Sequence, residues 1–477
     1  MRTRRRPAAA AALLLCAACA CAGGGGDGDG TVPAPRHTEG ARGGHHVLRV
    51  ATASDVTIGP VRERLIRAWD AAREDYTVEI VRLPVAADGV RGQLMAALQS
   101  GSADYDVINI DVAWTAEFAA GGLIRPLAGD LPEDMWPNVA ATARYRGRTW
   151  AVPFNTDAGL LYYRTDIWKD SAWKPPRTWE ELERDVGAAR SPDQVHRTFE
   201  DGYITQLAPY EGLTVNAQEA VWARGGEFVD EDGEVTAGSD RVRYGLEDIY
   251  REYQQLMPKS LARAADEHDS YAAFRDGRVP FMRNWPYVYN LLSAPGSKVR
   301  GRFGVTQLPG RDGNPGVSVL GGQNLAITRH SGQATAAREL LDYLTRPAQQ
   351  RCLLDAGFAP VLRSAYRPAT PATTCALPTT DPGGGADGGG KGGGGTGGGG
   401  RGGERSDAVP KDRNGLPEYA EPLRRALRTA RPRPVTPYYA AFTELIQTTV
   451  HDLLTNGTSS RLSRDLATGL ERVLKGG

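Results

Sequence analysis

The sequence has little of what metalloenzymes and nucleic-acid-binding proteins depend on. It contains only seven histidines and five cysteines in 477 residues, and its 57 acidic and 57 basic residues give a formal net charge of zero. Because neither sign of charge dominates, nucleic acid is not a predicted partner. The histidines are dispersed, and the one adjacent pair, His45 and His46, lies in a glycine-rich stretch. We therefore expect no metal site, no histidine-dependent nucleophile and no cofactor.

Motifs of nucleotide-binding and hydrolytic enzymes are also missing. A G-x-S-x-G nucleophile elbow does not occur in the sequence. The stretch GADGGGKG from Gly385 imitates the start of a phosphate-binding loop, but Gly392 stands where that loop needs Ser or Thr. Paired carboxylates could still serve a glycosidase, and Asp111, Asp157 and Glu211 are candidates. A protein that only binds a sugar would use the same carboxylates, because they accept hydrogen bonds from hydroxyls.

The N-terminus has the composition of an export signal. Basic residues precede an apolar stretch, residues 7–18, that is too short to span a bilayer. We predict a signal peptide over residues 1–18. Residues 19–46 are rich in glycine and poor in large apolar side chains, so we predict a flexible tether there. The protein is therefore expected to be exported.

The five cysteines fall into two groups. Cys16, Cys19 and Cys21 lie around the end of the signal, and the small residues before them favour Cys19 as a lipidated cysteine, with Cys21 as the alternative. A lipid there would anchor the protein to the outer face of the cytoplasmic membrane. Secretion after cleavage at an alanine is the other interpretation. Cys352 and Cys375 remain in the mature domain, where an oxidising environment favours a disulfide, although two buried free thiols would fit equally well.

Strand and helix patterns alternate after the tether. Strands are predicted at residues 48–53, 76–83 and 105–110, with helices at 61–69 and 93–98 between them. This alternation predicts a parallel sheet, in which ligands bind beyond the carboxyl ends of the strands. The residues at those ends that could line such a crevice are Ser54 and Asp55 after the first strand, and Asp111 and Trp114 after the third.

The segment 147–182 combines a short apolar strand, a polar stretch and a helix start. We predict a strand at 151–154, a turn at 155–159 that carries Asp157, and a second strand at 160–163. Thr178, followed three residues later by Glu181, forms a capping-box pattern, so a helix should begin at the next residue.

The remainder of the chain predicts a second lobe and a return to the first. Helical patterns dominate residues 175–292. The later elements that we expect are strands at 303–308 and 324–328, a helix at 334–344 and helices within 416–474, whereas residues 381–405 are nearly pure glycine and predict no fold.

Six stretches, in order, resemble one known family. The stretch 147–182 holds Val152, Pro153, Asn155, Asp157 and the run LLYYR. The others are LQSGSADYDVINIDVAWTAEFAAGGLIRPL from Leu98, YEGLTVNAQEAVWARGGEFVD from Tyr210, FRDGRVPFMRNWP from Phe274, VLGGQNLAIT from Val319 and RPRPVTPYY from Arg431. Together they make the chain after about residue 47 similar to family 1 extracellular solute-binding proteins of ABC sugar importers, such as the trehalose- and maltose-binding lipoproteins.

The resemblance implies an α/β, two-lobe fold like that of periplasmic binding proteins, type II-like, with hinge crossings between the lobes. It also implies a monomer whose partners are a sugar ligand and the membrane subunits of an ABC permease. The implied boundaries are lobe 1 over 47–157 and 323–380, lobe 2 over 158–322, a glycine-rich insert over 381–405, and C-terminal helices, mainly of lobe 2, over 406–477.

The same resemblance implies a set of sugar-binding residues. Family members contact their ligand at the positions of Asp111, Asp157, Trp285, Gly322 and Arg433. A sugar site needs charged acceptors, a planar donor and aromatic platforms, and these side chains supply all three. Where the family has a Trp, this chain has Gln323, which removes one stacking platform. The full candidate set is Ser54, Asp55, Asp111, Trp114, Asn155, Asp157, Glu211, Trp285, Gly322, Gln323 and Arg433.

Simpler roles remain open for several of these residues. Asp111 could cap a helix, Asp157 could close a turn, and Trp285 or Trp114 could belong to the core. Arg433 could fasten its proline-rich turn to a backbone carbonyl. The favoured hypothesis is a binding protein that captures a di- or oligosaccharide and delivers it to an ABC importer. The alternatives are a secreted carbohydrate-active enzyme and a sugar-binding sensor.

Overall fold

The structure is a computed structural model that describes residues 46–55, 57, 59–84, 87–168, 172–191, 199–375, 377, 409–457 and 461–476. The expected signal peptide, the lipidation cysteines, nearly all of the tether and the glycine-rich insert lie outside these ranges. The described residues belong to one unit, His45–Gly477.

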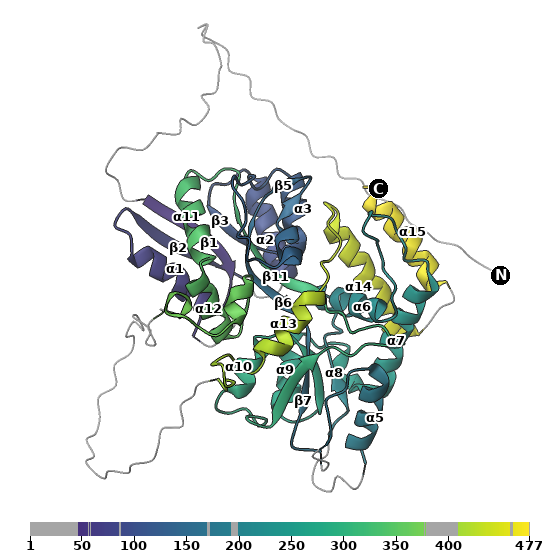
Figure 1. Cartoon of the computed structure of the whole chain (residues 1–477). Coiled ribbons are helices and arrows are strands. Elements are labelled where there is room, and N and C mark those ends of the chain that lie inside the picture. The colour runs from purple at the N-terminus through teal and green to yellow at the C-terminus, as the bar shows by residue number, and fades with distance from the viewer. Residues whose placement is uncertain are drawn as a thin grey trace, which may run out of the picture. The chain divides into compact units, whose positions relative to one another are not determined.

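The first lobe is built on a sheet whose strands run in the order β12-β6-β11-β3-β1-β2 (Figure 1). β1 pairs in parallel with β2 and with β3, which confirms the predicted parallel arrangement of these three strands. β11 is antiparallel to β3 and β6, so the sheet as a whole is mixed. The strands are β1 (His46–Ala53), β2 (Tyr76–Leu83), β3 (Val107–Asp111), β6 (Val152–Ala158), β11 (Leu320–Ile327) and β12 (Ala359–Pro360).

Helices cover both faces of this sheet. Side chains alternate along a strand, so Leu48 and Val50 of β1 face one helical layer while Ala51 faces the other. The first layer holds α1 (Val61–Ala71), α11 (Ala334–Leu344) and α12 (Pro347–Ala356). The second holds α2 (Ala87–Gln99) and α3 (Thr115–Ala120). Smaller elements of this lobe are η1 (Val112–Trp114), α4 (Pro137–Thr142), β4 (Arg144–Tyr145), β5 (Arg148–Thr149), η2 (Arg363–Tyr366) and η3 (Pro371–Thr373).

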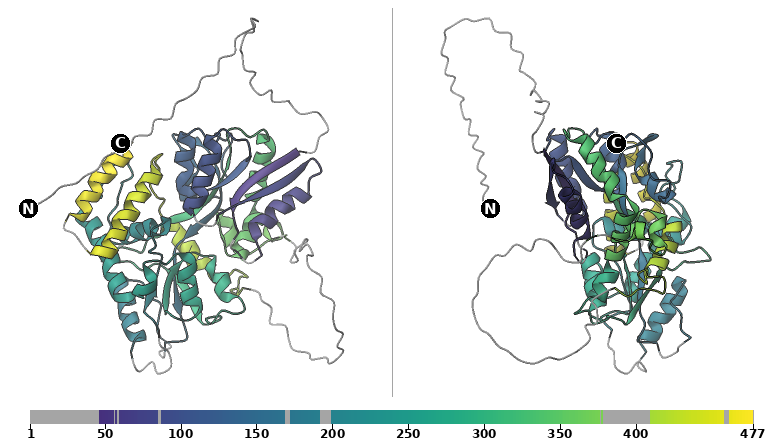
Figure 2. Two further views of the ribbon diagram at one scale, coloured as in Figure 1. Left: turned by 180° about the vertical axis from the view of Figure 1, so that it is seen from behind. Right: turned by 60° about the vertical axis from the view of Figure 1, so that its left-hand side comes forward.

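The second lobe contains a sheet in the order β10-β7-β9-β8 with helices on both sides. Figures 1 and 2 show the C-terminal helices α14 and α15 beside α6 and α7, which they contact. The strands are β7 (Leu160–Arg164), β8 (Tyr203–Ile204), β9 (Phe281–Asn284) and β10 (Phe303–Gln307). The helices are α5 (Trp179–Ala189), α6 (Glu211–Ala223), α7 (Asp240–Leu256), α8 (Lys259–Ala262), α9 (Glu267–Arg275), α10 (Val288–Ser293), α13 (Ala420–Thr429), α14 (Tyr439–Asn456) and α15 (Leu462–Leu474).

Two chain segments connect the two sheets, and a third segment lies beside them. β6 and β7 are separated only by Gly159, β10 leads back to β11, and the segment between α13 and α14 lies beside the second crossing. There Arg431 donates its backbone N–H to the Ser318 carbonyl at 3.0 Å and accepts from Leu320 N at 2.7 Å. These backbone hydrogen bonds join the second crossing to the segment between α13 and α14.

One local prediction was wrong. Residues 155–158 do not form a turn but continue β6, because β11 pairs with β6 on one side and β12 pairs with it on the other. Their polar side chains are thus held inside a sheet. The predicted helix start is confirmed: the Thr178 hydroxyl accepts from Glu181 N at 3.2 Å, although the Glu181 carboxylate turns back to Arg177 N.

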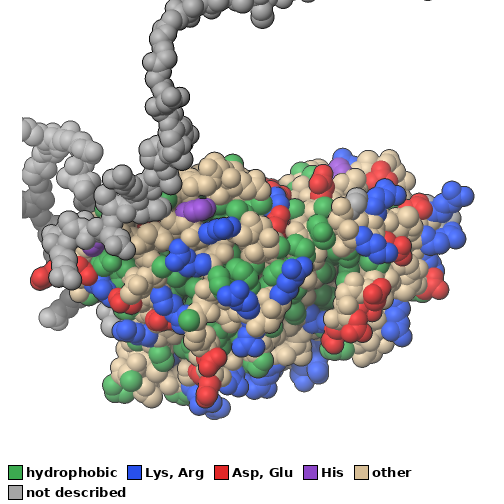
Figure 3. Space-filling view, turned by 90° about the horizontal axis from the view of Figure 1, so that it is seen from above, with side chains coloured by type: hydrophobic (Ala, Val, Ile, Leu, Met, Phe, Trp, Pro, Cys, Tyr) green, Lys and Arg blue, Asp and Glu red, His purple; other side chains and the backbone are tan. Residues whose placement is uncertain are grey.

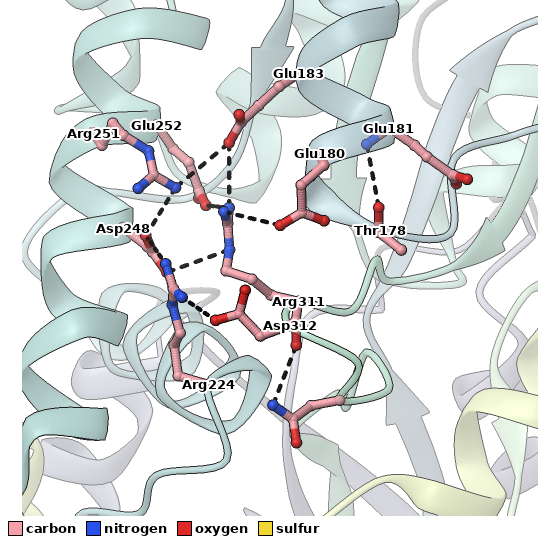
Figure 4. A network of polar contacts seen from close by, with 11 residues as sticks. Thr178, Glu180, Glu181, Glu183, Arg224, Asp248, Arg251, Glu252, Arg311 and Asp312 are labelled. Carbon is pink, nitrogen blue, oxygen red and sulfur yellow. Dashed lines mark hydrogen bonds and ion pairs between the residues drawn. The ribbon is translucent and has the colours of Figure 1, made fainter.

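A buried ionic network ties the segment after β10 to two helices of the second lobe (Figure 4). Arg311, 4% exposed, donates to Glu252 of α7 at 2.8 Å and pairs with Asp248 at 3.3 Å and with Glu183 of α5 at 3.4 Å. Burial raises the pKa of Glu252 to about 8, against the opposing effect of Arg311. The network fixes the segment from which the second crossing starts.

Cys352 and Cys375 form a disulfide that joins α12 to the end of the described segment after η3. Acidic and basic side chains are interspersed over the face seen in Figure 3. None of the described helices combines the length and the apolar character needed to cross a bilayer.

Candidate ligand-binding site

A single guanidinium connects elements of both lobes. Arg433, between α13 and α14, is 4% exposed. Its Nη2 donates to Oδ1 of Asp111 at 2.5 Å, and its Nη1 donates to Oε1 of Glu211 at 2.6 Å. Asp111 ends β3 of the first lobe, and Glu211 begins α6 of the second. The Arg433 guanidinium is therefore engaged by two carboxylates, and both of these partners were predicted site residues.

Glu211 holds the Arg433 guanidinium in place. Its Oε1 also accepts from the Tyr439 hydroxyl at 2.5 Å, and its Oε2 accepts from Thr443 at 2.7 Å. With both oxygens engaged and the residue 7% exposed, Glu211 has little capacity left for a ligand. The Nε of Arg433, in contrast, is buried without a hydrogen-bond partner.

Asp111 caps a helix with one carboxylate oxygen and keeps the other oxygen available. Its Oδ1 accepts from Ala113 N at 2.8 Å, which starts η1, so the capping role is present together with the ion pair. Both contacts fall on Oδ1, and the side chain is 22% exposed, which leaves Oδ2 for a ligand. Burial raises the pKa of Asp111, against Arg433, which lowers it.

Asp157 is the least satisfied carboxylate of the site. It lies in β6, so it does not close a turn, and its Oδ1 is buried without a hydrogen-bond partner. Its Oδ2 accepts only a long bond, 3.4 Å, from Asn155 Nδ2, and Asn155 Oδ1 is itself unpartnered. Burial raises the pKa of Asp157 to about 8, with Arg62 opposing and Asp111 adding to the rise. Unmet acceptors at this depth are what a hydroxyl-rich ligand would satisfy.

Trp285 stands beside Asp157. It follows β9, and its Nε1 donates to Glu267 at 3.2 Å. The Arg283 guanidinium lies 4.0 Å from the ring centroid, so a ligand could stack only on the other ring face. A Cβ built on Gly321 would lie 3.2 Å from the indole and 3.3 Å from Cβ of Asp157. Glycine at position 321 therefore lets the ring approach the carboxylate.

Gln323 and Gly322 complete the site from β11. Gln323 pairs with Asp111 across the sheet, and its Oε1 accepts from Arg62 Nη2 at 2.7 Å and from Asn109 Nδ2 at 3.0 Å. What Gln323 can offer a ligand is therefore its Nε2–H. Gly322 has a φ of +113°, and a Cβ there would lie 2.4 Å from the Asn155 carbonyl oxygen, so this backbone requires glycine.

Three predicted residues lie outside this cluster or are used otherwise. Both oxygens of Asp55 accept local hydrogen bonds, including one from Arg62 N at 2.7 Å, and so organise the start of α1. Trp114 is 4% exposed and stacks on Phe118 in the core. Ser54 lies half-buried after β1. Ligand contact by these residues remains only a prediction.

Sequence reasoning missed Arg62 and Asn109. Arg62 is 3% exposed, and its Nη1 donates to Thr52 at 2.8 Å. Its position in the first turn of α1, the helix that follows the first strand, could have indicated it. Among the described residues, no group of three or more His, Cys, Asp or Glu side chains could hold a metal ion. The arrangement offers charged hydrogen-bond acceptors, planar donors and one aromatic face.

Comparisons with known proteins agree on one family. Residues 66–379 match the family described as bacterial extracellular solute-binding protein. A probable ABC transporter-binding protein of Deinococcus radiodurans is 30% identical over 307 residues, which cover 63% of this chain and 72% of that protein. An arabinooligosaccharide-binding protein of Halalkalibacterium halodurans is 23% identical over 318 residues, or 62% and 67% of the two chains.

Solved structures match nearly the whole chain. The maltose-bound MalE3 of T. maritima is 26% identical, with a TM-score of 0.72 over 90% of this chain and 99% of that one. The GacH receptor of Streptomyces glaucescens, 20% identical, has the same fold, with a TM-score of 0.69 over 90% and 99%. The expected two-lobe fold is thus confirmed. The chain belongs to the family of bacterial extracellular solute-binding proteins.

Proposed function

We propose that this protein captures a sugar, preferably a di- or oligosaccharide, outside the cell and delivers it to the permease of an ABC importer. The observation that carries the proposal is the pair of incompletely satisfied carboxylates, Asp111 and Asp157, at the junction of the lobes beside the partly buried ring of Trp285. The names of the relatives, which include maltose- and arabinooligosaccharide-binding proteins, support the same class of ligand.

Each group has a defined task in this proposal. Asp111 Oδ2 and Asp157 Oδ1 accept hydrogen bonds from sugar hydroxyls, Gln323 Nε2 donates one, and Trp285 stacks on an apolar face of a pyranose ring. Arg433 holds Asp111 in place and donates through its Nε. No bond of the sugar is made or broken, so the protein binds without catalysis.

Delivery follows from closure about the hinge. A sugar that contacts both lobes binds the closed state more tightly than the open state and so stabilises it. The permease recognises the closed state. ATP is hydrolysed by a separate subunit. We further propose that Cys19, or alternatively Cys21, carries a lipid that anchors a monomeric protein to the outer face of the cytoplasmic membrane.

A thermal-shift screen tests the proposal. The purified protein is heated with mono-, di- and trisaccharides, amino acids, polyamines and phosphate. A ligand at 100 times its dissociation constant adds about 2.7 kcal/mol of stability. We expect a shift with one sugar class and a smaller one in Asp157→Asn. A response confined to amino acids, polyamines or phosphate would refute sugar binding and leave the fold assignment intact. Release of a shorter sugar over time would refute the absence of catalysis.

A further inference from the structure

A short hairpin of the first lobe carries arginines that have no carboxylate partner. Its two strands, β4 and β5, pair antiparallel around a two-residue loop, Arg146 and Gly147. Arg144, Arg146 and Arg148 are exposed, and the side chain of none of them forms an ion pair or a hydrogen bond with a described residue. Arginines elsewhere on the surface, such as Arg278, do pair with a glutamate. The hairpin therefore presents three unpaired guanidinium groups on a protein whose formal net charge is zero.

The loop of the hairpin is strained. Arg146 has a φ of +49° and Gly147 has a φ of +71°, the pattern of a type I′ turn, which favours Asn followed by Gly. A larger side chain in this region of backbone conformation costs stability. The loop also protrudes, since both residues are exposed and a Cβ built on Gly147 would meet nothing within 4 Å. An arginine at a strained and protruding position indicates a role outside the fold.

Two aromatic rings hold the arginines of the hairpin. The Arg146 guanidinium lies 5.2 Å from the ring centroid of Tyr145, and the Arg148 guanidinium lies 5.4 Å from that of Trp150. Trp150 Nε1 donates to the Tyr145 carbonyl at 3.0 Å, and both rings are half-buried and pack against the core. Because the rings are fixed, the guanidinium groups lose less freedom when they bind a partner. Their N–H groups remain available to an anion.

Exposed apolar side chains lie near the base of the hairpin. Val435, at 56%, is the most exposed large hydrophobic side chain of the described residues, and Tyr438 is 41% exposed. Val435 lines a small hollow together with Thr142, two residues before β4, and with Arg433 of the candidate site. Figure 3 looks onto the side of the molecule on which Figure 1 draws β5, and basic side chains lie among apolar ones there. The hairpin thus starts next to exposed apolar surface and close to the candidate site.

Phospholipid headgroups suit this combination of side chains. A guanidinium forms two parallel hydrogen bonds to one phosphate, and a layer of headgroups offers a phosphate to each of the three arginines. Tyrosine and tryptophan favour the boundary between headgroups and acyl chains, because one end of the side chain is polar and the rest is apolar. The exposed valine gains by leaving water.

The proposed lipid anchor keeps the hairpin within reach of such a surface. A glycine-rich chain of the length of residues 19–46 has a root-mean-square span of about 30 Å, so a protein lipidated at Cys19 stays near the membrane. Each arginine near anionic lipids raises binding about fivefold. For a tethered domain this attraction is enough to select one orientation, because the effective concentration at the surface is high. An acidic protein would have to be recruited from solution, so the lipid surface is the favoured occupant.

We propose that the β4–β5 hairpin, together with Val435 and Tyr438, docks onto anionic phospholipid headgroups at the outer face of the membrane. Because the base of the hairpin lies close to Arg433, docking turns the sugar site toward the membrane that holds the permease. This inference rests on the proposed lipid anchor and does not depend on which sugar is bound.

Co-sedimentation with lipid vesicles tests the inference. The full chain with Cys16→Ser, Cys19→Ser and Cys21→Ser, which cannot be lipidated, is mixed with vesicles of equal parts phosphatidylglycerol and phosphatidylcholine, or of phosphatidylcholine alone. We expect at least about tenfold tighter binding to the anionic vesicles at low salt, and loss of this preference in about 1 M salt, at which the Debye length is about 3 Å. In the same background, R144Q/R146Q/R148Q should bind the anionic vesicles at least about tenfold more weakly.

A matched control removes the same charge elsewhere. R263Q/R367Q/R413Q, at three exposed positions outside the hairpin, should bind the anionic vesicles as the unsubstituted chain does.

A further variant separates docking from folding. Arg146→Asn replaces the strained residue by one that tolerates a positive φ and completes the Asn-Gly pair of a type I′ turn. It should melt at a higher temperature than the wild type and yet bind anionic vesicles about fivefold more weakly. A purely structural role of Arg146 would not produce these opposite changes.

Three results would overturn the inference: equal binding to anionic and neutral vesicles, equal losses in the hairpin variant and the control variant, or undiminished binding by R144Q/R146Q/R148Q. The last result would leave an acidic protein surface as the occupant of the hairpin. No sugar enters these measurements, so each of these results spares sugar capture. Silence toward every sugar in the thermal-shift screen would refute the proposed function and leave the vesicle result standing.

Discussion

At the scale of single residues, the site is defined by groups that lack partners. Asp157 Oδ1, Asn155 Oδ1 and Arg433 Nε are all buried without a hydrogen bond. A protein that only needed stability would replace such groups or pair them. Their unpaired state in the absence of a sugar is a cost that a ligand with hydroxyls would relieve.

The raised pKa of Asp157 predicts a pH dependence. The carboxyl has a pKa of about 8 in the folded protein and of about 3.8 in the unfolded chain, so the folded state holds a proton that the unfolded state releases. Stability of the ligand-free protein should therefore fall as pH rises from about 4 to about 8. Asp157→Asn, which cannot ionise, should flatten this fall in melting temperatures recorded across that range.

Asp104→Asn, at an exposed position, is the control and should leave the pH profile unchanged. Asp111 and Glu252 also have raised pKa values, so part of the slope will persist in Asp157→Asn. An identical slope in wild type and Asp157→Asn would contradict the assignment.

At the scale of elements, a buried ion pair positions the hinge. Glu219 of α6 pairs with Arg283 of β9 at 2.7 Å and accepts from Val319 N at 3.0 Å. Ser318 Oγ donates to Glu219 at 3.1 Å and accepts from Gly159 N at 2.6 Å. One carboxylate thereby fixes both the first and the second crossing.

Gly159→Ala should disturb this arrangement. A Cβ at this position would lie 2.5 Å from Nη2 of Arg283, whose side chain is held by Glu219 and is 1% exposed. The hinge must shift to admit the methyl group, which should cost about 1–3 kcal/mol in denaturant unfolding and weaken sugar binding.

Gly187→Ala in α5 is the matched control, because its Cβ would meet nothing within 4 Å. It should stabilise the protein by up to about 1 kcal/mol, the difference in helix propensity, without a change in affinity. Equal effects of the two substitutions would show that the hinge tolerates a side chain.

The disulfide should contribute to the stability of the first lobe. It closes a loop with a sequence separation of 23 residues, next to α12 and η3. Cys352→Ser with Cys375→Ser should lower the free energy of unfolding by about 2–4 kcal/mol, chiefly by freeing the unfolded chain. Sugar affinity should remain, because neither cysteine belongs to the candidate binding site. Unchanged stability in denaturant titrations would argue against the bond in solution.

At the scale of the whole molecule, the fold was predictable wherever the spacing of apolar residues within one segment indicated its secondary structure. α11 begins and ends at the residues that the helical spacing predicts, 334–344, and the first three strands appear in the expected parallel order. The end of β6 was not predictable, since its polar residues become a strand only through partners from β11 and β12. Arg62 was missed for the same reason, because its partner Gln323 is distant in sequence.

Closure about the hinge is the prediction that belongs to the whole molecule. Fluorophores on exposed positions of the two lobes should approach each other when sugar is added, because contacts from both lobes favour the closed state. The same labelled pair in Asp157→Asn should need more sugar for the same change. A distance that stays constant at saturating sugar would contradict closure and leave binding itself intact.

The two crossings and the segment beside them have a consequence for how the lobes can move. One hydrogen bond joins Gly159 to Ser318, and another joins Ser318 to Arg431. The crossings should therefore bend together rather than separately. We therefore expect the lobes to move mainly along one coordinate, the opening angle between them. A partner that contacts both lobes then senses only this angle, whichever sugar is bound. The residues of the sugar site can consequently differ between proteins while the closed conformation that the partner contacts stays the same.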